Sequence, residues 1–342
     1  MKALAKTIEV INGKNIDQIK LMNDNGITLS LLTLGATWQE FLVPSHEGVR
    51  NIIIGFDKPS DYLKNGLCAG QSIGRVAGRI DNGTFTIDND FIEVPKNENG
   101  NCLHGGPQGF HKQIWDYEIT SDAREASVTF RYQAKEEVDG FPGNIDVSIT
   151  YTLKQDNQIY ISFIGENATK PTLFNPTNHV YFNLTDDQNL DAHDLYLNSR
   201  IYLETREDLV PTGQMIAVDE TNYDFRWAKN LGQAIRDNGG FDTAFLTESS
   251  LDTVNGSLNL NGKEGINFYS DRNSWVIYTM GGIPNDIYPS RDKGNEAKEF
   301  EGIALEAQFL PDAINHEGFG DIVLNPGDKK VYTIRFDYFK VS

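Results

Sequence analysis

The segment at residues 175–184 holds side chains of the kinds that transfer protons and bind hydroxyl groups. It reads Asn-Pro-Thr-Asn-His-Val-Tyr-Phe-Asn-Leu, and its alternation with a period of two predicts a half-buried strand. The two faces would differ, one being apolar with Val180, Phe182 and Leu184 and the other polar with His179, Tyr181 and Asn183. The polar face indicates the lining of a pocket. A histidine that packs against its neighbours at the strand surface is the alternative.

A second strand pattern, at residues 303–311, places a carboxylate among apolar neighbours. Glu306 and Gln308 would share one face of this strand, between Ala304 and Leu310. Apolar neighbours partly desolvate a carboxylate, and desolvation raises its pKa toward that of a useful general base. An ordinary glutamate on a half-exposed strand is the alternative interpretation.

Two loop motifs add candidate binding residues. His104 lies in Cys-Leu-His-Gly-Gly-Pro at residues 102–107, a tight turn in which the backbone can approach a ligand closely. Asp242 lies in Gly-Gly-Phe-Asp-Thr-Ala-Phe at residues 239–245, where it either binds a ligand or closes an Asx turn. For His104 the alternative is a side chain that caps its own turn.

A third loop motif, Gly-Arg-Val-Ala-Gly-Arg-Ile at residues 74–80, contains Arg75 and Arg79. These arginines could donate hydrogen bonds to hydroxyl groups, or they could pair with the chain's many acidic residues. The glycines do not have the spacing of a phosphate-binding fingerprint, and no long helix is expected after them.

The spacing of the remaining reactive residues supports neither a metal site nor a hydrolase triad. His104 and His111 lack the spacing of metal ligands, and Cys68 and Cys102 do not form a C-x-x-C pair, so we expect no metal. The chain has no Gly-x-Ser-x-Gly elbow. A histidine and a glutamate with hydroxyl-binding neighbours remain, which indicates proton transfer on a neutral polyol without a cofactor.

The composition narrows the range of partners. A formal net charge of −19 argues against binding to nucleic acid or to an anionic membrane, because both need basic patches, whereas a neutral small molecule is not penalised. Two cysteines are too few for a disulfide framework, and the N-terminus lacks an apolar run of signal-peptide length. We therefore expect a cytoplasmic protein, either a monomer or a homodimer, that binds a small molecule.

Alternation with a period of two recurs along almost the whole chain, most clearly at residues 128–132, 145–163 and 332–338. With 31 glycines and many Asn/Asp turns, the chain is predicted to be all-β, a large antiparallel β-sandwich, in one domain over residues 1–342. Further strands are expected at residues 27–43, 51–56, 84–94, 194–203, 265–270, 275–280 and 303–310. Short helical pieces are expected at residues 60–63 and 231–235. Long loops that could hold a site lie at residues 68–81, 96–113, 238–245 and 281–300.

Taken together, these motifs resemble the aldose 1-epimerase (galactose mutarotase) family. The matching pieces follow the family's order and span most of the chain: Gly-Arg-Val-Ala-Gly-Arg-Ile near residue 74, Leu-His-Gly-Gly at 103, Gly-Phe-Pro-Gly at 140, the whole segment 175–184, Phe-Asp-Thr-Ala-Phe at 241 and Glu-Ala-Gln-Phe-Leu-Pro-Asp-Ala-Ile-Asn at 306. The piece Thr-Asn-His-x-Tyr-Phe-Asn-Leu is highly specific. The resemblance implies a galactose-mutarotase-like supersandwich that interconverts the α and β anomers of a free aldose such as galactose or glucose.

The resemblance also implies residue roles, carried over by position. Glu306 would be the general base and His179 the general acid of ring opening. The residues that bind the substrate would be His104, Arg79 and Asp242, to which we add Gln308. An apolar face for the sugar is expected from Trp38, Tyr181 or Trp275.

Three departures from the family pattern leave the preferred sugar open: Gly78 in place of asparagine, Thr243 in place of histidine, and Met280-Gly281 in a piece that commonly reads Tyr-Thr-Gly-Asn. A hexose-phosphate 1-epimerase is one alternative, and it would need a cationic clamp for which Arg75 and Arg79 are the clustered candidates. A non-catalytic carbohydrate-binding module on the same fold is another. A glycosidase is disfavoured because one well-placed carboxylate is present rather than a facing pair.

Overall fold

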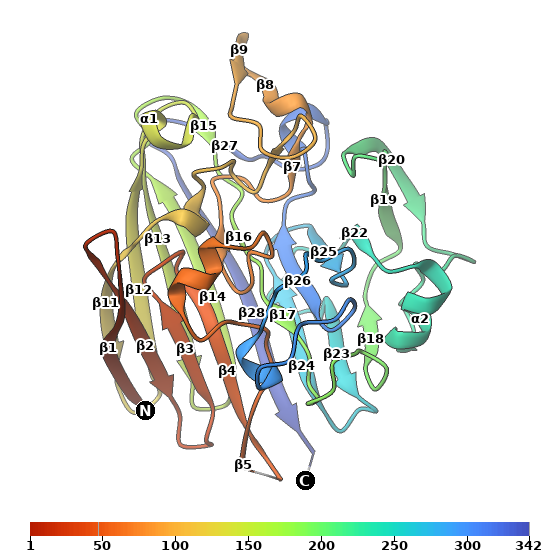
Figure 1. Cartoon of the computed structure of the whole chain (residues 1–342). Coiled ribbons are helices and arrows are strands. Elements are labelled where there is room, and N and C mark those ends of the chain that lie inside the picture. Colours follow the sequence, from red (N-terminus) through yellow and green to blue (C-terminus); the bar gives the residue numbers. More distant parts are fainter. Residues whose placement is uncertain (47, 342) are drawn as a thin grey trace.

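Antiparallel strands form the framework of the protein in the computed structural model, which describes residues 1–46 and 48–341 (Figure 1). The first strands pair in chain order into an N-terminal sheet, seen at the left of Figure 1. Its strands are β1 (Lys2–Ile11), β2 (Lys14–Met22), β3 (Thr28–Leu32), β4 (Thr37–Ser45) and β5 (Gly48–Asn51). The predicted strand at residues 27–43 is thus a hairpin, because Gly35 and Ala36 turn the chain with positive φ angles of 66° and 42°.

The longest strands belong to a central sheet. In spatial order these are β11 (Asp116–Ser121), β12 (Glu125–Ala134), β13 (Ile145–Lys154), β14 (Gln158–Glu166), β28 (Lys329–Lys340), β24 (Glu264–Ser270), β23 (Gly256–Leu260), β18 (Asp194–Leu197) and β21 (Lys229–Asn230). Strands β13 and β14 form the predicted hairpin, and burial along both alternates residue by residue, as the sequence pattern requires. The buried residues of all three larger sheets meet in one apolar cluster.

A third sheet, called the cavity sheet below, carries the site. Its strands in spatial order are β17 (Tyr181–Phe182), β26 (Ile303–Gln308), β25 (Ser274–Tyr278), β22 (Asp242–Leu246), β19 (Ile201–Thr205) and β20 (Pro211–Ala217). The predicted strand at residues 194–203 is divided between two sheets, since β18 pairs in the central sheet and β19 in the cavity sheet. All residues of β26 are buried because neighbouring strands and loops cover both of its faces.

Short two-stranded pairs complete the strand structure of the described residues. They are β6 (Ser72–Ile73) with β16 (Thr177–Asn178), β7 (Arg79–Ile80) with β10 (Cys102–Leu103), β8 (Thr84–Ile87) with β9 (Asp90–Glu93), and β15 (Thr172–Leu173) with β27 (Val323–Leu324). The predicted strand at 84–94 is therefore also a hairpin. The predicted strand at 51–56 is wrong beyond Asn51, where a single bridge forms between Ile53 and Phe182 of the cavity sheet. Among the described residues, backbone contact with that sheet is confined to this bridge and to hydrogen bonds of Ile54 with Tyr181 and of Ile52 with Asn183.

The helices are short, as predicted. They are α1 (Glu136–Asp139) and α2 (Leu231–Asn238), with 3-10 turns at Pro59–Leu63, Asp81–Gly83, Phe110–Lys112, Ser290–Asp292 and Ala313–Asn315. Asn230 caps α2 by accepting a hydrogen bond from the Gln233 backbone N–H. Across residues 1–46 and 48–341, every helix falls short of the length and apolar character needed to cross a membrane. The prediction of a large antiparallel β-sandwich is confirmed.

Candidate active site

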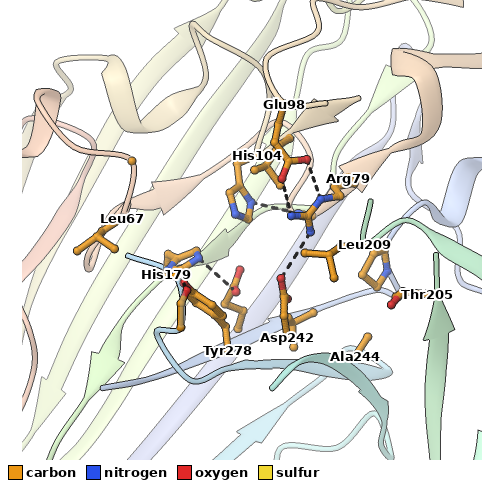
Figure 2. A pocket seen from close by; sticks show the side chains of 18 of the residues that line it. Leu67, Arg79, Glu98, His104, His179, Thr205, Leu209, Asp242, Ala244 and Tyr278 are labelled. Atoms are coloured by element: carbon orange, nitrogen blue, oxygen red, sulfur yellow. Dashed lines mark hydrogen bonds and ion pairs between the residues drawn. The ribbon is translucent and has the colours of Figure 1, made fainter. Parts of the chain in front are cut away.

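A cavity of about 410 Å³ lies on the cavity sheet and brings together the site residues that the sequence predicted. Each of the four long loops contributes to its lining. The predicted residues among the lining are Arg79, His104, His179, Asp242, Glu306 and Gln308. Figure 2 shows several of them pointing toward one another from different elements.

His179 lies where the predicted strand at 175–184 is interrupted. The chain leaves its pairing with β6 after Asn178 and joins β26 at Tyr181, so His179 sits between two short strands. Its backbone N–H donates to the Gln71 carbonyl at 2.9 Å, and its own carbonyl accepts from the Gly70 N–H at 2.9 Å. These two bonds fix the imidazole at the cavity wall.

The two predicted faces of this segment are correct except at Asn183. Val180, Phe182 and Leu184 are fully buried in the apolar core, and Tyr181 lines the cavity. Asn183 instead donates to backbone carbonyls, including that of Glu301 at 2.7 Å, and is not among the cavity-lining residues. The chain changes its partner strand between Asn178 and Tyr181, which ends the simple alternation. The Asn183 amide therefore serves a structural role.

Glu306 projects from the middle of β26 onto the cavity floor. Its neighbours in register on β25 are apolar or aromatic, with Val276 opposite Glu306 and Tyr278 opposite Ala304. Burial raises the pKa of Glu306 well above its ordinary value, the negative charge of Asp242 raises it further, and the positive charge of Arg79 opposes both. The desolvation expected from the sequence is therefore present.

His179 and Glu306 face one another as a buried couple. The His179 Nε2 lies 3.4 Å from the Glu306 Oε1, and both side chains are nearly inaccessible. Burial lowers the pKa of His179 to about 4. Burial thus disfavours the charged form of both groups, and moving a proton from the Glu306 carboxyl to His179 would convert the neutral couple into carboxylate and imidazolium.

Several polar atoms at this end of the cavity have no hydrogen-bond partner among the described residues. They are the His179 Nδ1, the Glu306 Oε2 and both side-chain polar atoms of Gln308. Buried polar groups in folded proteins are nearly always paired, so these cavity atoms are free to hydrogen-bond a polar ligand.

His104 is held as a neutral hydrogen-bond donor. The Gly78 backbone N–H donates to the His104 Nδ1 at 3.2 Å, so Nδ1 carries the lone pair and Nε2 carries the hydrogen. Burial lowers the pKa of His104 well below its usual value, as do the nearby charges of His179 and Arg79. Gly105 allows the loop to approach closely, because a Cβ there would lie 1.9 Å from the Gly74 carbonyl oxygen.

Potential metal-binding atoms of His104, His179 and Glu306 lie within 4.8 Å of one another. The sequence did not predict this cluster because its members are far apart in the chain. The tautomer of His104 opposes a metal on Nε2, since that nitrogen would have to release its hydrogen to Nδ1, where the Gly78 N–H already points. The arrangement suits hydrogen bonding to a neutral ligand better than coordination.

Arg79 is clamped by two acidic residues in the same cavity. Its Nε and Nη2 donate to the Glu98 carboxylate at 2.9 and 2.7 Å, and its Nη1 lies 3.8 Å from the Asp242 Oδ2 (Figure 2). Burial lowers the pKa of Arg79, but the hydrogen bonds to Glu98 and the charge of Asp242 outweigh this and raise it overall. Sequence reasoning missed Glu98, which lies in the predicted loop at 96–113 without a recognisable motif.

Of four further candidates, Arg75, Trp38 and Trp275 do not reach the cavity and only Tyr181 lines it. Arg75 is fully buried and binds the Asp139 carboxylate through Nε and Nη2, so it does not reach the cavity. Trp38 and Trp275 are fully buried in the core and cannot offer a face to a sugar. Tyr181 does line the cavity, with its hydroxyl donated to the Leu67 carbonyl at 3.0 Å.

The departures from the family pattern fall partly inside the cavity. Gly78 lines it with φ of 72°, and a Cβ there would lie 3.1 Å from the Pro311 Cβ. Gly281 also lines it and accepts the Tyr278 hydroxyl at 2.6 Å. Thr243 and Met280 are buried outside the lining. Only the two glycines therefore bear directly on the shape of the site.

An antiparallel supersandwich whose cavity holds a buried histidine–glutamate couple among other polar side chains is the arrangement of an enzyme of the mutarotase class. The chain belongs to the aldose 1-epimerase family, whose model matches residues 17–337. It is 47% identical to an aldose 1-epimerase from Streptococcus thermophilus over 100% of both chains. It is 35% identical to a maltose epimerase from Levilactobacillus brevis over 96% of each chain. The crystal structure of galactose 1-epimerase from Lactobacillus acidophilus superposes with a TM-score of 0.88 at 26% identity, covering 100% of this chain and 99% of that one.

Proposed function

We propose that this aldose 1-epimerase acts on free aldohexoses such as galactose and glucose, with His179 and Glu306 as its acid–base pair. The observation that carries the proposal is the 3.4 Å approach of His179 and Glu306 inside a cavity whose buried polar atoms lack partners among the described residues. Relatives named for galactose and maltose support a sugar substrate for this site.

Ring opening needs one proton removed and one added. Glu306 as carboxylate takes the proton of the anomeric hydroxyl while His179 as imidazolium protonates the ring oxygen, and the bond between C1 and the ring oxygen breaks. Rotation about the bond from C1 to C2 presents the other face of the aldehyde. The same two groups then act in reverse, and the couple regains the single proton with which it started.

The other polar residues would hold the sugar. The His104 Nε2–H would donate to an oxygen whose charge changes during ring opening, which is electrostatic help of the oxyanion-hole kind. Arg79, Asp242 and Gln308 would bind ring hydroxyls. Glu98 would hold the guanidinium of Arg79 through the two bonds on its Nε edge, leaving Nη1 toward the substrate side.

The charges in the cavity favour a substrate without phosphate. Among the cavity-lining residues of the described chain, Arg79 is the single arginine, and Glu98, Asp242 and Glu306 lie beside it. Arg75, the other arginine of the possible phosphate clamp, is hydrogen-bonded to Asp139 and does not reach the cavity. A phosphate dianion would therefore meet net negative charge.

Polarimetry of freshly dissolved α-galactose, α-glucose and glucose 6-phosphate tests the proposal. We expect faster mutarotation of the free sugars than of the phosphate. Faster turnover of glucose 6-phosphate would favour the hexose-phosphate alternative. Binding of galactose without faster mutarotation would show a non-catalytic carbohydrate-binding module.

We further propose the cytoplasm as the compartment, which is compatible with the free, buried thiols of Cys68 and Cys102. The single domain over residues 1–342, the monomer or homodimer, and the absence of nucleic-acid and membrane partners stay predictions from the sequence.

A further inference from the structure

Arg272 carries a positive charge in the interior of the protein. It lies in the turn between β24 and β25, where the chain passes from the central sheet to the cavity sheet. Its side chain is fully buried, and its guanidinium carbon lies 5.6 and 5.2 Å from the ring centroids of Phe163 and Tyr332. Burial lowers the pKa of Arg272 to about 10, so it stays protonated at neutral pH. The two rings partly replace the hydration that the buried cation has lost.

The hydrogen bonding of this guanidinium is directed at the segment that carries His179. Its Nη1 donates to the Pro176 carbonyl, while Nε and Nη2 have no partner among the described residues. The adjacent carboxylate of Asp271 accepts instead from the Thr333 backbone N–H, at 2.9 Å through each of its oxygens. Within the described chain, the Arg272 side chain therefore makes its hydrogen bond to a single carbonyl, three residues before His179.

The segment around His179 is attached on both sides to β26, the strand of the proposed general base. Before His179, the Asn175 side-chain amide donates to the Phe309 carbonyl at 3.2 Å and accepts from the Phe309 N–H at 3.0 Å, directly after β26. After His179, Tyr181 pairs with Ala304 of β26. The position of the imidazole relative to β26 therefore depends on the backbone between these two attachments.

The turn that holds Arg272 is itself fixed to β26. The Ser274 hydroxyl donates to the Gln308 carbonyl at 2.7 Å. Gln308 and Glu306 belong to the same strand, so the turn has a defined position relative to the carboxylate. Through Arg272 the same turn holds the segment before His179. It thus connects the two members of the catalytic couple.

We infer that Arg272 is a positioning residue, which sets the distance between His179 and Glu306 by holding the Pro176 carbonyl. The inference rests on the proposed function and goes beyond it, because Arg272 is not among the residues that line the cavity. A displacement of about 1 Å at an active site can cost on the order of a hundredfold in rate. A charged donor suits this role, since charge-assisted hydrogen bonds are roughly twice as strong as neutral ones.

Steady-state polarimetry of α-galactose, with thermal unfolding of each protein, tests this role. Arg272→Met removes the donor, and Arg272→Lys keeps a charged donor on a side chain of similar length. Arg75→Met is the matched control, because Arg75 is equally buried but its guanidinium binds Asp139. Arg272→Met/Asp271→Asn removes both neighbouring charges while an amide oxygen can still accept from the Thr333 N–H. This double variant answers the question if Arg272→Met alone does not fold.

We expect Arg272→Met to lower kcat about tenfold to a hundredfold, with KM within about threefold of wild type. Arg272→Met/Asp271→Asn should be as slow, and Arg272→Lys should recover most of the loss. The folded fraction of Arg75→Met should keep its kcat. If the variants without a donor keep kcat within about threefold, or if Arg272→Lys is no faster than they are, the inference is wrong and the guanidinium only stabilises the fold.

A double-mutant cycle shows whether Arg272 acts through His179. His179→Gln already lacks the proposed acid, so adding Arg272→Met to it should lower kcat by less than about threefold. A further loss as large as the one in wild type would contradict the inference. If wild type itself does not accelerate the mutarotation of galactose, the proposed function fails and the inference falls with it.

Discussion

Among the buried acid–base couples of the described residues, Arg75 with Asp139 and His179 with Glu306 have sharply different surroundings. Arg75 and Asp139 are joined by hydrogen bonds of 2.7 and 3.0 Å, and Arg75 also donates to the Thr172 hydroxyl at 3.1 Å. His179 and Glu306 approach only to 3.4 Å, and each keeps a polar atom without a partner among the described residues. Both couples are almost inaccessible to solvent.

The first couple is complete without a ligand, whereas the second is not. A buried charge whose hydrogen bonds are all made within the fold contributes to the framework, and removing one partner leaves an uncompensated charge. A buried couple with spare donors and acceptors is costly to the fold unless a ligand uses them. These two couples therefore differ in hydrogen bonding rather than in burial, and the couple with spare polar atoms is the one that lines the cavity.

The largest expected effect on activity comes from removing one member of the cavity couple. Glu306→Gln should lower kcat for α-galactose by about 10²–10⁴, the range for a single acid–base group. The melting temperature should stay unchanged or rise, because burial already disfavours the charge of Glu306. Polarimetry and thermal unfolding on the same preparation check this. A variant that loses stability together with activity would make Glu306 a framework residue like Asp139.

Changes to the Arg75–Asp139 couple should lower stability and leave kcat unchanged. Arg75→Met should lower the free energy of unfolding by about 3–5 kcal/mol, since Asp139 would be left charged and buried, while the folded fraction keeps its kcat. Denaturant unfolding measures the loss. The double variant Arg75→Met/Asp139→Leu should regain most of it, and a lasting loss of kcat in that folded protein would place Arg75 in the reaction.

Changing Arg79 should mainly weaken substrate binding, rather than abolish kcat or destabilise the fold. Arg79→Lys keeps the charge but loses the fork that binds Glu98, so kcat/KM for galactose should fall roughly tenfold to a hundredfold, mainly through KM. The melting temperature should change little, because the cavity-side Nη1 is not part of the packed core. Steady-state kinetics separates KM from kcat. A loss confined to kcat would contradict a binding role.

The pH profile offers a smaller but specific test. In the proposed mechanism the cavity couple acts with one proton, so activity should be lost when the couple gains a second proton or gives up the first. Burial lowers the pKa of His179 to about 4 and raises that of Glu306, and Arg79, Asp242 and His104 face the couple. The acid limb of kcat/KM should therefore lie near pH 4. A limb near 6.5 would show an imidazole in an ordinary solvated environment.

Strand alternation is a local signal, so the sequence was sufficient for the β-sandwich. The local motifs left the six cavity residues open to structural alternatives, and the family resemblance was needed to select them. The local motifs could not separate Arg75 from Arg79, which share one motif, since Asp139 and Glu98 reach them only in the folded chain.

The prediction that Trp38 or Trp275 offers an apolar face to the sugar was wrong for a similar reason. Burial of a tryptophan depends on which sheet covers it, and both side chains are fully buried. Strand order also brings to the cavity four lining residues that belong to no motif, Leu203, Thr205, Leu209 and Pro211.

The most direct test compares single variants of the cavity couple with the double variant, by initial-rate polarimetry of α-galactose. If His179 and Glu306 act as one unit, His179→Gln/Glu306→Gln should be no more than about tenfold slower than the slower single variant. A double variant whose loss equals the product of the two single losses would contradict a shared proton. So would a single variant that retains the wild-type rate.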